Sequence, residues 1–142
     1  MSSVFTKIIN REIMAYIIYE DDKVIAFLDQ YPLQLGHVLI VSKAEVDNWL
    51  DIDVTDYLAV HKVAQNIGKA ISKSMLENLG FERIGQMVDG RAVPHFHLHL
   101  IPLFEGQEII HNEKTRKNFT NTQMEQIQAK IISNLEKSKL DE

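Results

Sequence analysis

Three histidines stand at alternate positions of one short stretch of the chain, which reads His-Phe-His-Leu-His-Leu-Ile-Pro over residues 95–102. Side chains of a strand point to opposite faces in turn, so this alternation predicts a half-buried strand. The apolar residues would enter the core, and His95, His97 and His99 would line a face open to water. Packing alone does not explain three imidazoles on one face. The pattern therefore predicts a chemical site.

Metal binding is one chemistry open to such a row, because imidazole is a common ligand of zinc, copper and iron. Neighbouring same-face residues of a strand lie about 6.6 Å apart, and the outer pair about 13 Å apart, from a rise of about 3.3 Å per residue. A metal bonded at about 2 Å to each nitrogen cannot easily take all three imidazoles. No cysteine supplies further ligands. We expect no metal, and a metal-dependent phosphohydrolase remains an alternative.

Nucleophilic catalysis is the second chemistry that the row could perform. A neutral imidazole nitrogen can attack a phosphorus or acyl centre and form a covalent intermediate. Flanking imidazoles can donate hydrogen bonds to the oxygens on which negative charge develops. The attacking ring needs its far nitrogen protonated and held by an acceptor. His97, in the middle of the row, is the predicted nucleophile.

Length and composition limit the class of protein. The chain has 142 residues, of which 45% are hydrophobic, and this predicts a single domain over residues 1–142. Fifteen lysines and arginines against twenty acidic residues give a net charge of −5, which argues against a nucleic-acid partner. The lack of cysteine excludes disulfides and thiolate metal sites. We expect a cytoplasmic protein with no membrane partner, because the sequence shows neither a signal-peptide pattern nor an apolar run of transmembrane length.

The spacing of apolar residues predicts an α+β domain. Helices are expected at about residues 4–9 and 53–79, and strands at 16–19, 24–28, 36–41, 81–88 and 95–102. Asp53 or Thr55 would cap the long helix, and Gly80 would end it. Hairpin connections between neighbouring strands predict an antiparallel sheet with the helices on one side. His61, at the flank of the long helix, is assigned no chemistry.

A polar, irregular stretch is expected between Pro102 and about Asn121. An extra C-terminal helix would follow, because apolar residues recur there at helical spacing. Thr122 and Glu125 form the capping-box pattern that predicts its first turn.

The chain resembles the histidine triad (HIT) nucleotide-binding family. Residues 95–102 match the family's alternating histidine signature, and four further blocks look like the family's blocks, in the family's order. These blocks cover residues 5–13, 19–22, 26–29 and 36–43. The resemblance extends over about residues 4–103, and the tail and last helix at about 104–142 lie outside it. It implies a five-stranded antiparallel sheet that is joined to a second sheet across a homodimer.

The resemblance also implies roles for the matching residues. His97 corresponds to the nucleophile that attacks the α-phosphorus of a purine nucleotide or dinucleotide, giving a nucleotidyl-histidine that water then cleaves. His99 corresponds to the residue that contacts the phosphate and helps to protonate the leaving group, and His95 and His37 to two supporting histidines. Asp29 corresponds to the carboxylate that accepts hydrogen bonds from the ribose hydroxyls. The apolar slot around the base corresponds to Phe5, Ile8, Phe27 and Leu28. No cofactor is implied.

The segment before the histidine row departs from the family pattern. Many relatives have Gly-Gln followed by Ser or Thr, whereas this chain has Gly90, Arg91, Ala92, Val93 and Pro94. Arg91 would be either a charged fork for the substrate phosphate or a solvated loop residue. Ala92 lacks the hydroxyl, which argues against efficient protonation of an amine leaving group.

A structural zinc site found in some bacterial relatives is not expected in this chain. Those relatives use two cysteines and a histidine, and the matching positions carry Ser3, Thr6 and Glu45.

A metal-independent HIT-type nucleotide hydrolase or nucleotidyl transferase is the favoured function. A nucleotide-binding module with little turnover is the second hypothesis. The sequence sets neither the base preference nor the choice among dinucleoside polyphosphates, nucleoside phosphoramidates and nucleotidylated sugars.

Overall fold

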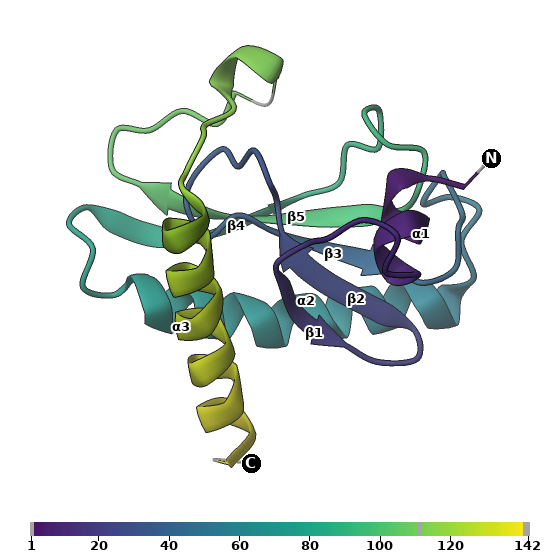
Figure 1. Ribbon diagram of the computed structural model, residues 1–142, viewed down its shortest axis with the longest axis horizontal. Helices are drawn as coiled ribbons and strands as arrows, with labels where there is room; N and C mark the ends of the chain where they lie inside the picture. Colours follow the sequence, from purple (N-terminus) through teal and green to yellow (C-terminus); the bar gives the residue numbers. More distant parts are fainter. Residues whose placement is uncertain (1, 111, 141–142) are drawn as a thin grey trace.

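The computed structural model describes residues 2–110 and 112–140 (Figure 1). Its elements are α1 (Val4–Ile9), β1 (Ile17–Glu20), β2 (Val24–Leu28), β3 (Val38–Ser42), α2 (Val54–Met75), β4 (Phe81–Met87), β5 (His97–Phe104), the 3₁₀ turn η1 (Glu113–Thr115) and α3 (Asn121–Leu140). The strands pair in the order β1-β2-β3-β5-β4, and every pairing is antiparallel. This confirms the predicted α+β fold with a five-stranded antiparallel sheet.

The centre of the sheet is apolar on both faces. β2 and β3 read Val-Ile-Ala-Phe-Leu and Val-Leu-Ile-Val-Ser, and every one of their residues is buried. Such β-branched and aromatic residues pack well on a pleated surface. A sheet with two apolar faces needs cover on both sides, and the helices supply it.

The two long helices cover one face of the sheet and α1 covers the other (Figure 1). Residues of α2 and α3 pack with Phe96, Leu98 and Leu100 in the main core. On the opposite face, Phe5 and Ile8 of α1 pack against side chains of β2 and β3 in a smaller cluster. The prediction put the helices on one side, and α1 is the exception, because its two apolar residues cover the second buried face.

The ends of α2 agree with the prediction at one terminus only. The Asp53 carboxylate accepts a hydrogen bond from the Thr55 amide, which caps the first turn. The helix ends at Met75, however, and does not continue to Gly80. Backbone bonds from the Asn78 amide to the Met75 carbonyl and from the Phe81 amide to the Asn78 carbonyl form turns instead. Gly80, at φ +82°, serves the turn that leads into β4.

The start of α3 has a capping box two residues earlier than predicted. The Gln123 amide donates to the Thr120 hydroxyl, and the Thr120 amide donates to the Gln123 side chain. Thr120 and Gln123 thus take the roles predicted for Thr122 and Glu125. No helix in the described part of the chain is both long enough and apolar enough to span a bilayer.

Candidate active site

β5 carries the histidine row on the face that α1 covers. His97 and His99 lie opposite Val41 and Leu39 of β3, which belong to the cluster around Phe5. His95 lies just before β5, because the regular pairing begins at His97. The prediction that this face is open to water is wrong, because all three histidines are at most 3% exposed. The reason is α1, whose Phe5 ring centroid lies 4.9 Å from that of His97.

The proton of His97 is fixed by the backbone. Its Nδ1 atom lies 2.6 Å from the carbonyl oxygen of His95. A carbonyl can only accept, so Nδ1 carries the proton and donates it, and the Nε2 atom of the neutral ring keeps its lone pair. His97 lines a pocket that Phe5 of α1 and Phe27 of β2 also line. This tautomer is the one that an attacking imidazole requires.

A second chain of bonds fixes the proton of His99. The Leu33 amide donates to Nδ1 of His37 at 3.1 Å, so His37 carries its proton on Nε2. That Nε2 atom lies 2.9 Å from Nδ1 of His99 and donates to it. Neutral His99 consequently carries its own proton on Nε2. Because His99 also lines the pocket, the row contains an acceptor ring and a donor ring side by side.

His95 ties α1 to the sheet. Its Nε2 atom donates to the Ser42 carbonyl at 2.6 Å, and its Nδ1 atom accepts from the Ser3 hydroxyl at 2.6 Å. Burial lowers the pKa of His95 below 6.5, against the opposing effects of the Ser42 bond and the Glu45 charge. The ring is therefore neutral at pH 7, as its two partners require. Ser3 is also the N-cap of α1.

The three residues that stand in place of zinc ligands in some relatives form hydrogen bonds with one another. One carboxylate oxygen of Glu45 accepts from the Ser3 amide at 2.6 Å and from the Thr6 hydroxyl at 2.7 Å. These bonds lower the pKa of Glu45. The bonds among Ser3, Thr6, Glu45 and His95 hold the start of α1 against the sheet.

A pocket of about 630 Å³ lies beside His97 and His99. Its lining includes the residues predicted to bind the sugar and the base, which are Asp29, Phe5, Ile8, Phe27 and Leu28. His37 and His95 do not line the pocket, but His37 donates to His99, and the His95 carbonyl accepts from His97. The structure thus brings together almost every residue that the sequence singled out.

Arg91 does not line the pocket either, and among the described residues no bond links it to one that does. Its guanidinium donates twice to the Asp89 carboxylate, at 2.6 and 2.9 Å, and its side chain is 86% exposed. This is the geometry of the solvated loop residue, the second of the two predicted alternatives. Ala92 and Val93, by contrast, line the pocket.

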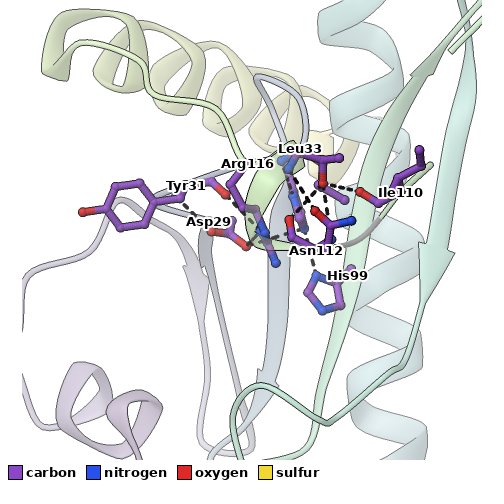
Figure 2. Close-up of polar contacts among 9 residues, drawn as sticks. Asp29, Tyr31, Leu33, His99, Ile110, Asn112 and Arg116 are labelled. Carbon is purple, nitrogen blue, oxygen red and sulfur yellow. Dashed lines mark hydrogen bonds and ion pairs between the residues drawn. The ribbon is translucent and has the colours of Figure 1, made fainter. Parts of the chain in front are cut away.

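Sequence reasoning missed the contribution of the C-terminal segment. Arg116, which precedes α3, and Asn121 and Glu125 of α3 all line the pocket. Arg116 donates to the Asp29 carboxylate at 2.6 Å, from a position 87 residues further along the chain (Figure 2). No local pattern signals a pairing over that separation, and the family resemblance ends before it.

One group of side chains in the described part of the chain offers ligand atoms close enough to hold a metal. The atoms belong to Asp29, His37 and His99 and lie within 4.8 Å of one another. A metal on Nε2 of His37 would move the ring proton to Nδ1, which already faces the Leu33 amide proton. Asp29 is also paired with Arg116. This donor set therefore does not fit a metal ion.

The fold and the site together define a class of α+β domain in which a strand carries a row of buried imidazoles beside a pocket. The sequence model of one protein family, the HIT domain, matches residues 10–106 of this chain. The chain belongs to the HIT family.

Individual relatives support this assignment. An uncharacterized HIT-like protein of Saccharolobus solfataricus is 33% identical over 137 residues, which cover 93% of this chain and 96% of the relative. The crystal structure of a hypothetical histidine triad nucleotide-binding protein from Sulfolobus tokodaii superposes with a TM-score of 0.82 at 31% identity, covering 96% of this chain and 93% of that one. The structure of a HIT family hydrolase from Clostridium thermocellum superposes with a TM-score of 0.60 at 29% identity, covering 78% of this chain and 97% of that one.

Proposed function

We propose that this protein cleaves purine nucleotide derivatives at the α-phosphate through a covalent nucleotide adduct on His97. The observation that carries the proposal is the bond from Nδ1 of His97 to the His95 carbonyl, which leaves the lone pair on Nε2. The names of two relatives agree with it, since one is a nucleotide-binding protein and the other a hydrolase.

The pocket suits the three parts of a nucleotide. The base would lie in the apolar slot, in which the Phe5 and Phe27 rings meet edge to face at 5.6 Å. The ribose hydroxyls would donate to Asp29. The α-phosphate would then lie beside His97 and His99, where a donor and an acceptor nitrogen meet.

The first chemical step would be attack by Nε2 of His97 on the α-phosphorus. The new N–P bond forms as the bond to the leaving group breaks, and the leaving group takes that electron pair. The Nδ1 proton stays on His97, and the His95 carbonyl that accepts it stabilises the positive charge of the substituted ring. The Nε2 proton of His99 donates a hydrogen bond to the phosphate oxygens.

The second step would release the nucleotide. Water attacks the phosphorus, the N–P bond breaks, and its electron pair returns to Nε2 of His97. The proton of the water goes to the nucleoside monophosphate or to solvent. A phosphate leaving group departs as an anion and needs no proton, whereas an amine does. Ala92, at the pocket lining, has no hydroxyl to help deliver one, which favours anhydride substrates such as dinucleoside polyphosphates.

A turnover screen tests the proposal. Purified protein is incubated with a dinucleoside polyphosphate, a nucleoside phosphoramidate and a nucleotidylated sugar, and the His97→Ala variant serves as control. We expect release of a nucleoside monophosphate from at least the first, reduced by roughly 10³-fold or more in the variant. Thermal melting of both proteins verifies that the variant is folded.

Two results of this screen would contradict the proposal. Binding without turnover would support the nucleotide-binding module. Loss of activity on exhaustive chelation, with restoration by added metal, would support the metal-dependent phosphohydrolase.

A further inference from the structure

The Asp29 carboxylate is held by two donors from different parts of the chain. Its Oδ1 atom accepts from the Tyr31 amide at 3.0 Å, and its Oδ2 atom accepts from Nη1 of Arg116 at 2.6 Å. The same Nη1 atom also donates to the Tyr31 carbonyl at 2.9 Å. Figure 2 shows Asp29, Tyr31 and Arg116 in this closed ring of hydrogen bonds.

The segment that carries Arg116 is itself fixed to the loop after Asp29. The Lys117 amide donates to the Pro32 carbonyl at 2.9 Å, and the Lys117 ammonium lies 3.4 Å from the Gln34 side-chain oxygen. The side chains of Asp29 and Arg116 are 14% and 21% exposed, so water screens their pair only in part. Arg116 therefore reaches the carboxylate from an anchored backbone.

This ring of bonds determines what Asp29 can still accept. Two carboxylate oxygens offer about four lone-pair positions, and Tyr31 and Arg116 each occupy one of them. Oδ2 lies 3.8 Å from Nε2 of His37, beyond hydrogen-bond distance, and the Nε2 proton of His37 goes to His99. The remaining positions suit two hydroxyls on neighbouring carbons, as in the 2′,3′-diol of a ribonucleotide.

We infer that Arg116 is a positioning residue that orients the Asp29 carboxylate toward the ribose diol and so selects ribonucleotides over deoxynucleotides. The inference rests on the proposed function, because it assumes that the pocket binds a nucleotide. It concerns a residue outside the matched HIT domain, which ends at residue 106. The C-terminal segment of this chain thus completes the sugar subsite.

Calorimetric titration with adenosine monophosphate and with its 2′,3′-dideoxy analogue tests the inference, because neither ligand needs turnover. We expect the wild type to bind the ribonucleotide more tightly. Arg116→Ala should weaken ribonucleotide binding about ten-fold, because a misoriented Asp29 loses one charge-assisted hydrogen bond from a ribose hydroxyl. The affinity for the dideoxy analogue should stay nearly unchanged. Arg116→Lys keeps the charge but not the planar fork, so its affinity for the ribonucleotide should lie between those of the wild type and Arg116→Ala.

Lys117→Ala is the matched control, because it removes a side-chain contact of the same segment without touching Asp29. It should leave the preference for the ribonucleotide unchanged, and thermal melting verifies the fold of each variant.

Three outcomes would overturn the inference. An equal loss of affinity for both ligands in Arg116→Ala would mean that Arg116 only stabilises the segment. Tighter ribonucleotide binding in that variant would mean that Arg116 competes with the sugar for Asp29. If the wild type bound neither ligand, the proposed function would fail first and the inference with it, whereas the first two outcomes leave the proposed function intact.

Discussion

The Ser3 side chain links α1 to the sheet through two hydrogen bonds. Its hydroxyl oxygen accepts from the Thr6 amide at 3.1 Å as the N-cap of the helix, and its proton goes to Nδ1 of His95 at 2.6 Å. Both partners of that second bond are buried, with exposed fractions of 8% for Ser3 and 0% for His95. We therefore expect Ser3→Ala to loosen the helix that places Phe5 and Ile8 at the pocket.

Two losses add in this variant. Removal of an N-cap costs about 1 kcal/mol. A buried imidazole nitrogen that loses its donor costs about 1–3 kcal/mol more. The free energy of unfolding should thus fall by about 2–4 kcal/mol, which corresponds to a decrease of roughly 6–15 °C in the melting temperature of a domain of this size.

Urea denaturation followed by circular dichroism measures the change. Ser2→Ala is the matched control, because Ser2 is exposed and the substitution removes the same atom. We expect the control to stay within about 0.5 kcal/mol of the wild type. If Ser3→Ala were as stable as Ser2→Ala, the bond to His95 would contribute nothing, and the account of how α1 is held would be wrong.

Three further predictions follow from the site. Ala92→Ser should raise turnover of a phosphoramidate relative to that of a dinucleoside polyphosphate. An unchanged ratio in steady-state assays would contradict the view that the missing hydroxyl limits protonation of an amine leaving group. Stability should fall as the pH drops below 6.5, because burial lowers the pKa of His95 and the unfolded chain takes up a proton that the folded chain refuses. The free energy of unfolding of His95→Gln, measured by urea denaturation, should fall less steeply over this pH range than that of the wild type. An equal fall in both proteins would argue against a contribution from His95. Arg91→Ala should change kcat/KM by less than about two-fold, because Arg91 is exposed and pairs with Asp89. A larger loss would return Arg91 to the phosphate site.

The strand with the histidine row was predictable because its chemistry and its packing follow the same period of two. Phe96 and Leu98 enter the main core, while His97 and His99 face the other way. The pattern could not reveal that α1 lies over the imidazoles, because that depends on the second apolar face that β2 and β3 present. A local sequence pattern assigns a residue to a face but does not say what covers that face.

Element ends and long-range pairs were less predictable. Gly80 is a good stop signal for a helix, yet α2 ends at Met75, where turns through Asn78 redirect the chain. Arg116 carries no sequence signal of its own, since an arginine in a polar segment reads as a solvated residue. Its pairing with Asp29 arises only when the segment after β5 folds back over the pocket.

Localisation of the covalent adduct tests the central claim most directly. The protein is mixed with a dinucleoside polyphosphate, quenched at alkaline pH to preserve the N–P bond, and analysed by mass spectrometry of the intact chain and of its peptides. The account predicts a mass gain of one nucleoside monophosphate on His97 and none in His97→Ala. An adduct on a different histidine, or turnover with no adduct at all, would contradict it.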